Sequence, residues 1–316
     1  EEDVDTIETG SRLGMFLVLT ARPKEGLEYL EKAKEVCLKI KGPKDPFYTP
    51  QVLLQYGRAL EAIGRPEQAL QSISEAVENR RKNRPGTGYL AQMLEDQALV
   101  LTELGQYEEA DKLLRESEHI HNQVGQKLDI NYFAPCVKLA LAKGDLDGAN
   151  ALLDHNFGAP SESAELSGPS LSNLEARSEI AVRRGDGKSA IALAHRISAA
   201  IESSRQQVYF GGFYSRALLN EAEGRLLQRD GAGTMPLIQR AAQRQVEMSD
   251  PTSPTLARTA ALLGWAYLES GDRKRAAESL AKAKAILRAH PQLSDRYALT
   301  VRELSERMAL ANHRLQ

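Results

Sequence analysis

A glycine recurs about every 40 residues along most of this chain, each time between two segments whose apolar residues have helical spacing. Glycine ends helices because it adopts the left-handed conformation at little cost, and Asp272, directly after Gly271, can cap the following helix. Each such stretch is therefore predicted to be a helical hairpin. The marker glycines are Gly64, Gly105, Gly144, Gly185, Gly231 and Gly271, separated by 41, 39, 41, 46 and 40 residues.

Small residues flank the markers at constant offsets. Seven residues before the markers stand Gly57, Ala98, Val137, Ser178, Gly224 and Gly264, and five residues after most of them stand Ala69, Ala110, Ala149, Ala190 and Ala276. Small side chains on both helices let the two backbones approach closely. An earlier hairpin fits the same offsets with Gly14 and Gly26, although Ala21 replaces its marker. Because a lone hairpin cannot bury its own apolar faces, the hairpins are expected to stack on one another.

This pattern resembles the tetratricopeptide repeat (TPR), in a long form similar to that of kinesin light chains. The resemblance implies an all-α, right-handed superhelical solenoid of about seven TPR-like hairpins, and residues 292–313 are predicted to form a C-terminal capping helix. Such arrays bind protein or peptide partners. The ending His290-Pro291-Gln292-Leu293 is also similar to the C-terminal TPR regions of some bacterial serine/threonine protein kinases, which implies a bacterial signalling context.

The chain is predicted to divide into two blocks of repeats. An N-terminal block of about four repeats covers 1–155, and a C-terminal block of about three repeats with the capping helix covers 171–316. Residues 156–170 are rich in Gly, Pro and Ser and lack an apolar period, which is typical of a loop. This segment is either a hinge between the blocks or a surface loop.

Charge and composition narrow the partners. The net charge is −2, so there is no basic footprint for nucleic acid. No apolar run approaches the ~20 residues of a membrane helix, and no membrane contact by this segment is expected. Localisation is left open between the cytoplasm and the extracytoplasmic part of a membrane-anchored signalling protein. Cys37 and Cys136 fall in different repeats and are predicted to be free thiols.

Motifs that would indicate an enzyme or a cofactor site fail on context. Gly187-Lys188-Ser189 ends like a phosphate-binding loop, but Val182 stands where that loop needs its first glycine. His119 and His121 are two residues apart on a predicted helix and so point away from each other. We therefore predict no enzymatic activity, no metal and no cofactor.

In TPR superhelices the first helix of each hairpin lines a concave groove. Counting from the small residue, the positions one after and three before it should face this groove, and Asn131 lies on the same face one turn away, as do Gln51 and Gln92. The candidate partner-binding residues are Arg58, Glu95, Asn131, Lys138, Glu175, Glu179, Glu221, Arg225 and Trp265.

Three features of this surface have two interpretations each. Trp265, the single Trp, either anchors a ligand or packs against the neighbouring repeat. The charges from Glu175 to Arg229 either pair with each other or receive a mixed-charge peptide. The aromatic residues of 209–214 either form a sticky lip or staple a turn.

The sequence thus predicts a protein-interaction or sensory module that takes a partner segment in its groove. Kinesin light chains line their grooves with Asn residues that grip ligand backbones, whereas here Asn131 and Asn220 are the only first-helix candidates, and this departure argues against sequence-independent peptide binding. The alternatives are a small-molecule or short-peptide sensor that changes superhelical pitch, and a self-associating scaffold.

Overall fold

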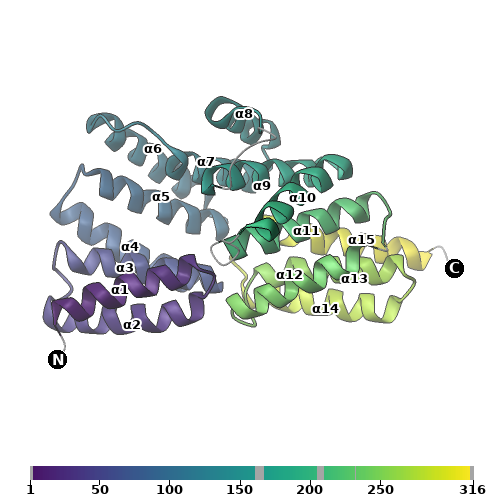
Figure 1. Cartoon of the computed structure of the whole chain (residues 1–316), viewed down its shortest axis with the longest axis horizontal. Coiled ribbons are helices and arrows are strands. Elements are labelled where there is room, and N and C mark those ends of the chain that lie inside the picture. Colours follow the sequence, from purple (N-terminus) through teal and green to yellow (C-terminus); the bar gives the residue numbers. More distant parts are fainter. Residues whose placement is uncertain (1–2, 161–166, 205–209, 232, 314–316) are drawn as a thin grey trace. The chain divides into compact units, whose positions relative to one another are not determined.

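The computed structural model describes residues 3–160, 167–204, 210–231 and 233–313. Within these residues the chain forms fifteen α-helices and no strand (Figure 1). Fourteen helices follow one another in seven pairs, each joined by a short turn, and the fifteenth comes last. The predicted all-α architecture of successive helical hairpins is confirmed.

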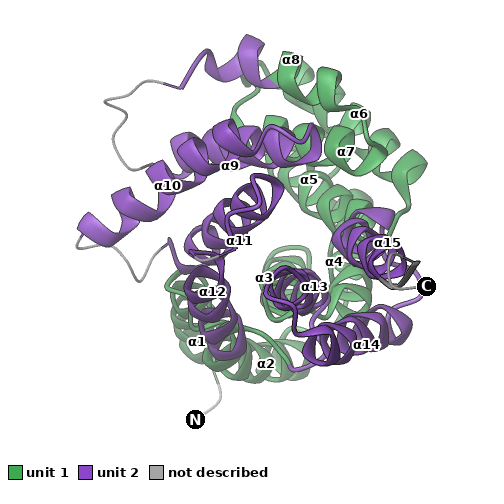
Figure 2. Ribbon diagram, turned by 90° about the vertical axis from the view of Figure 1, so that its right-hand side faces the viewer, with its two compact units in different colours: residues 1–152, 248–250 green, residues 153–247, 251–316 purple. Residues whose placement is uncertain are grey.

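The helices belong to two compact units, coloured separately in Figure 2. Unit 1 comprises residues 1–152 and 248–250, and unit 2 comprises 153–247 and 251–316. The first eight helices, of which the last crosses the division, are α1 (Val4–Leu19), α2 (Pro23–Ile40), α3 (Tyr48–Ile63), α4 (Pro66–Asn83), α5 (Gly88–Glu103), α6 (Tyr107–Gln123), α7 (Ile130–Lys143) and α8 (Leu146–Phe157). Unit 2 continues with α9 (Gly168–Arg183), α10 (Gly187–Ser203), α11 (Gly211–Leu227), α12 (Thr234–Met248, of which Met248 belongs to unit 1), α13 (Thr255–Glu269), α14 (Arg273–Ala289), the 3-10 turn η2 (Asp295–Ala298) and α15 (Leu299–His313).

The marker glycines end the first helices as predicted. Gly64, Gly105, Gly144, Gly185 and Gly271 all have positive φ, between 70° and 86°. Ala21 takes the same conformation in the first hairpin, with φ 57°. The left-handed residue ends the first helix and turns the chain back toward the second. Backbone N–H groups at the turn then bond to the last carbonyls of the first helix.

The sixth marker is displaced by two residues from its predicted place. Arg229, with φ 60°, occupies the left-handed position, whereas Gly231 does not. The marker spacings around it become 44 and 42 residues. The small-residue positions move with the marker to Ala222 and Thr234, both fully buried. The prediction placed the turn at the nearest glycine, whereas this hairpin has a non-glycine residue in the left-handed conformation despite its steric cost.

The small residues let paired helices approach closely, as expected. A Cβ atom on Gly57 would lie 2.5 Å from Ile73 Cγ1 and 3.2 Å from the Ala69 carbonyl oxygen. A Cβ atom on Gly264 would lie 3.2 Å from the Ala276 carbonyl oxygen. Gly14 meets Gly26 in the same way in the first hairpin.

The C-terminal helix covers the last hairpin, but it starts later than predicted. Residues 295–298 form η2, and the α-helix begins only at Leu299. Val301 and Leu304 are buried against the core of α13 and α14, with Met308 packed beside them. Ser294 caps η2 by accepting from the Arg296 backbone N–H, which accounts for the break in the predicted single helix.

The predicted loop at 156–170 is shorter at both ends. Helix α8 extends to Phe157, and Ser167 caps α9, which begins at Gly168. Residues 161–166 lie outside the described part of the chain. The hinge and the block boundaries at 155 and 171 stay a prediction.

Candidate functional site

Three amide side chains stand at one equivalent position in three consecutive first helices of unit 1. Gln51, Gln92 and Asn131 each lie six residues before the small residue of α3, α5 and α7. Helix α5 packs beside both α3 and α7. Gln51 and Asn131 are exposed, and Gln92 is half-buried. We call these three residues the amide row.

The amide row keeps most of its hydrogen-bonding capacity unused. Within the described residues the side chains of Gln51 and Gln92 form no hydrogen bond. Asn131 Nδ2 donates to Asp129 Oδ2 at 3.3 Å, and Asp129 also caps α7 by accepting from the Asn131 backbone N–H. The Asn131 side-chain oxygen accepts nothing from the described part of the chain. An amide that offers both a donor and an acceptor can pair with a peptide backbone.

Two cations follow the amide row two turns along the same helices. The Arg58 guanidinium forms a two-point pair with Asp96, with Nε–Oδ1 at 3.1 Å and Nη2–Oδ2 at 2.6 Å, yet 40% of its side chain stays exposed. Lys138 on α7 is half-buried and has no ion-pair partner among the described residues. Unit 1 therefore holds one paired and one uncompensated cation beside the amide row.

Glu95 does not face the predicted groove. It is 3% exposed, and its Oε1 lies 2.7 Å from Ser117 Oγ and 2.8 Å from His121 Nε2, both on α6. Burial raises the pKa of Glu95, although the hydrogen bonds from Ser117 and His121 oppose this. The prediction of a groove position was wrong because this side chain points into its own hairpin. Among the described residues no group of three His, Cys, Asp or Glu side chains is arranged to hold a metal ion.

Glu175 and Glu179 on α9 are bound by arginines of unit 2. Arg216 on α11 pairs with Glu175, with Nη2–Oε2 at 3.0 Å. Arg296 of η2 forms a two-point pair with Glu179, with Nε–Oε1 at 2.9 Å. Burial disfavours the Glu179 carboxylate, but Arg296 outweighs it and, with help from Arg258, lowers the pKa of Glu179.

The same polar network continues through α11, α13 and α15. Arg258 Nη2 donates to Asn220 Oδ1 at 2.6 Å and to Glu223 Oε2 at 2.7 Å. Thr300 donates to Glu223 Oε1 at 3.3 Å. Asn220, one of the two first-helix Asn candidates, is 2% exposed. Of the two interpretations of these charges, mutual pairing describes unit 2, although Arg216, Arg258 and Arg296 supply partners that the sequence did not single out.

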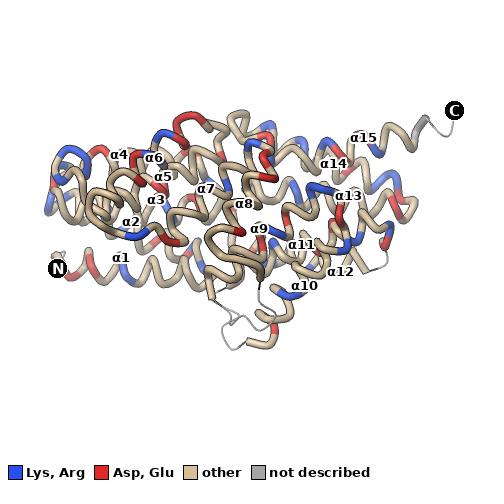
Figure 3. The backbone as a smooth tube through the Cα atoms, turned by 90° about the horizontal axis from the view of Figure 1, so that it is seen from above, with Lys and Arg blue, Asp and Glu red and all other residues tan. Residues whose placement is uncertain are grey.

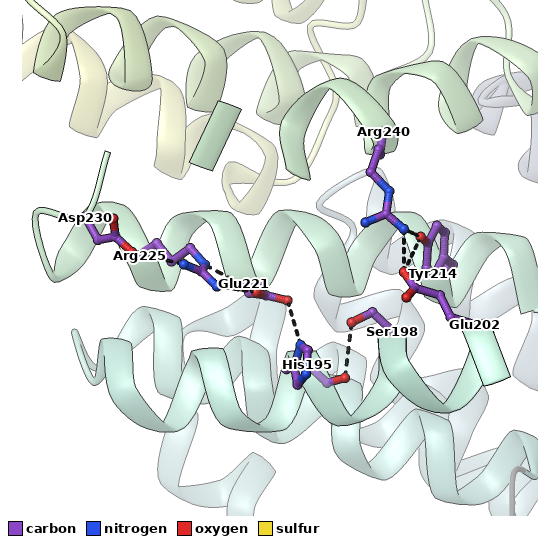
Figure 4. A network of polar contacts seen from close by, with 8 residues as sticks. All are labelled: His195, Ser198, Glu202, Tyr214, Glu221, Arg225, Asp230 and Arg240. Atoms are coloured by element: carbon purple, nitrogen blue, oxygen red, sulfur yellow. Dashed lines mark hydrogen bonds and ion pairs between the residues drawn. The ribbon is translucent and has the colours of Figure 1, made fainter. Parts of the chain in front are cut away.

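Glu221 faces α10 instead of the groove, and Arg225 lies along α11 between Glu221 and Asp230 (Figure 4). Glu221 is 3% exposed and accepts from Arg225 Nη2 at 3.0 Å, and His195 Nδ1 on α10 lies 3.6 Å away. Arg225 Nη1 also contacts Asp230 at 3.0 Å. The groove prediction was wrong for Glu221, which is buried, while that for Arg225 stays a prediction; counted from Ala222, the position one after the small residue is Glu223.

Trp265 is a core residue and not an exposed anchor. It is 1% exposed, and its Nε1 donates to Glu269 Oε1 at 3.2 Å. The Arg307 guanidinium of α15 lies 3.9 Å from the centroid of its ring. The packing interpretation is therefore correct, and its partner is the closing helix.

The aromatic residues around the start of α11 also pack against a buried cluster. Phe210, Phe213 and Tyr214 pack against the cluster of Leu171, Ile197 and their neighbours, and the Phe210 and Phe213 rings meet edge to face at 6.4 Å. Tyr209 lies outside the described residues. These contacts fit the staple and not the lip.

Cys37 is buried and Cys136 is partly buried, and both are free thiols. Burial raises the pKa of Cys136 to about 11 and also raises the pKa of Cys37. Neither thiol is therefore poised as a nucleophile.

Comparison with known proteins identifies the N-terminal hairpins. The tetratricopeptide repeat family model matches residues 5–82, which span α1 to α4. This segment is similar to tetratricopeptide repeats. No curated protein matches the chain. Among solved structures, a tetratricopeptide repeat protein from Parabacteroides merdae aligns with 96% of this chain and 99% of its own, at 17% identity and a TM-score of 0.49.

TPRs generally mediate protein interactions and are usually non-catalytic, so the family match agrees with a binding role at that general level. The later hairpins repeat the turn and small-residue geometry of the matched segment.

None of the helices in the described ranges combines the length and apolar character that a bilayer crossing demands. Acidic and basic residues are scattered along the helices of both units (Figure 3).

Proposed function

We propose that the chain is a protein-interaction module that binds an extended, acidic segment of a partner along the first helices of unit 1. The observation that supports this most is the amide row, whose side chains are accessible and largely without intramolecular hydrogen bonds. In unit 2 the predicted groove residues Glu175 and Glu179 on the first helix α9 already bind Arg216 and Arg296. A partner there would have to displace these arginines.

The repeat spacing suits an extended backbone. Adjacent packed helices lie roughly 8–10 Å apart, and an extended chain advances about 3.3 Å per residue. Each successive amide would therefore meet the partner about three residues further on. Amide side chains pair with backbone groups and so read little sequence, which leaves selectivity to the neighbouring charges.

Lys138 and Arg58 supply that selectivity. Lys138 is half-buried without an ion-pair partner among the described residues, and a carboxylate would compensate its charge. Arg58 is held in place by Asp96 but keeps an exposed side. A segment with Asp or Glu at about every third residue fits both positions.

The test uses two degenerate dodecapeptide libraries of equal length, one with Asp or Glu at every third residue and the other with Lys or Arg there. We expect the chain to bind the acidic library with at least tenfold higher affinity than the basic library, as measured by fluorescence polarisation. The variant with Gln51→Ala, Gln92→Ala and Asn131→Ala should lose three hydrogen bonds of about 0.5–1.5 kcal/mol each, at least about tenfold in affinity. Lys138→Gln should remove the preference for acidic peptides.

Gln71 and Lys82 on α4 are exposed residues of the same types, so Gln71→Ala with Lys82→Gln is the matched control. Equal affinity of the control and the amide-row variant for the acidic library would refute the proposed surface. Equal affinity of the native chain for both libraries would refute the acidic preference.

A further inference from the structure

Unit 2 has a cavity of about 400 Å³ between the end of α10, the start of α11 and helix α12. This volume lies at the lower end of the ~300–1,000 Å³ range of small-ligand sites. One wall is Ile201, and the remaining lining is polar: Glu202, Tyr214, Arg240, Gln243, Arg244 and Glu247.

One side of this cavity is fixed by a three-membered cluster, shown in Figure 4. Tyr214 donates its hydroxyl to Glu202 Oε1 at 2.6 Å. The Arg240 guanidinium contacts both Glu202 and the Tyr214 hydroxyl and lies 5.4 Å from the centroid of the Tyr214 ring. Arg240 is thereby held in one orientation by groups from two other helices.

The other side is an ion pair that opens easily. Arg244 Nη1 lies 3.1 Å from Glu247 Oε2, and the two side chains are 41% and 47% exposed. Gln243 Nε2 donates to Glu247 Oε1 at 3.4 Å. Exposed pairs of this kind contribute little to stability, so a ligand that replaces both halves of the pair meets little resistance.

The charges of the lining decide the ligand class. Two arginines face two glutamates, so a simple anion would compete with two carboxylates and a simple cation with two guanidinium groups. A molecule that carries both charges avoids the competition. We propose that this cavity binds a small zwitterion of the amino-acid or dipeptide class, inserted between Arg244 and Glu247.

In this arrangement the ligand carboxylate contacts Arg244 and the pre-oriented Arg240, which lie one helical turn apart on α12. The ligand ammonium contacts Glu247, which the exchange has released. The site lies in unit 2 on second helices, so it goes beyond the partner-binding surface proposed for unit 1. The sequence left open that the chain is a short-peptide sensor, and this cavity is the site that we propose for such a ligand.

Titration calorimetry of the whole chain with alanyl-alanine tests this site, with N-acetyl-alanyl-alanine and alanyl-alaninamide as ligands that each lack one charge. We expect alanyl-alanine to bind and each blocked form to bind at least tenfold more weakly. Arg244→Gln and Glu247→Gln should each weaken alanyl-alanine binding at least tenfold.

Glu278 and Lys282 are a matched acidic and basic pair on the exposed face of α14, and Glu278→Gln and Lys282→Gln should leave binding unchanged. All four substituted residues are exposed or half-exposed, and equal circular dichroism spectra verify the fold. The titration extends to about 10 mM alanyl-alanine, so that a dissociation constant of about 1 mM would still be detected. Absence of binding heat over this range overturns the proposal. Equal binding of the blocked forms, or of the Arg244 and Glu247 variants, overturns it as well.

Discussion

At the scale of single residues, closeness between paired helices depends on the absence of a side chain. A Cβ atom on Gly57 in α3 would lie closer to Ile73 Cγ1 than real Cβ atoms do, and its 3.2 Å distance to the Ala69 carbonyl oxygen would be tighter than an ordinary contact. A glycine inside a helix costs about 1 kcal/mol relative to alanine. Its presence here is explained by the packing, because any larger residue would push α3 away from α4.

We therefore predict that Gly57→Val destabilises the chain by about 2 kcal/mol or more, since overpacking a close contact costs about 1–3 kcal/mol and the rigid backbone oxygen cannot move aside. Urea unfolding followed by circular dichroism measures this. Gly168→Ala is the control, because a Cβ atom there meets nothing within 4 Å. A Gly57→Val midpoint equal to that of the control would show that the hairpin relaxes freely.

At the scale of elements, η2 and α15 do more than cover an apolar end. Leu304 packs over Gly264, Arg307 lies on the Trp265 ring, and Arg296 binds Glu179 on α9. With the bond from Thr300 to Glu223 on α11, one closing segment thus ties together helices from three different hairpins. A capping segment with these contacts is expected to contribute to the folding of unit 2 as a whole.

Leu304→Ala should cost about 2–4 kcal/mol, because it deletes a fully buried side chain. Trp265 is the only Trp in the chain, so its emission should also shift to longer wavelength as water enters beside it. Leu310→Ala on the same helix is the control, since Leu310 is 62% exposed. Identical emission spectra and midpoints in the two variants would rule out a sealing role for α15.

At the scale of the whole molecule, each unit has its own buried clusters. Ile7, Val36 and Val52 form one in unit 1, and Leu218, Leu262 and Trp265 belong to a large one in unit 2. Repeat arrays bury apolar surface mainly between neighbouring hairpins. Each block of repeats should therefore hold most of the contacts that its own folding needs.

We predict that fragments 1–158 and 167–316 fold separately into helical, cooperatively unfolding domains. Thermal unfolding of each fragment, followed by circular dichroism at the helix band, checks this. Their summed spectrum should match that of the whole chain. A fragment without a cooperative transition would mean that the division into two independent blocks is incorrect.

The sequence by itself determined the hairpins, because their causes are local. A left-handed turn residue, small residues at fixed offsets from it and apolar stripes all act within about 40 residues. Even the sixth hairpin was found, although its left-handed residue is Arg229 and not Gly231. That two-residue difference is enough to move Glu221 to another face of α11, because a helix turns about 100° per residue.

Only the tertiary structure decided which of the predicted groove residues are accessible. Burial of a side chain depends on helices that arrive from elsewhere in the chain: α6 encloses Glu95, α15 encloses Trp265, and Arg296 reaches Glu179 across 117 positions. No periodicity in the sequence encodes such pairings. Asn131, Lys138 and Arg58 keep accessible surface, which is why we propose the partner site in unit 1.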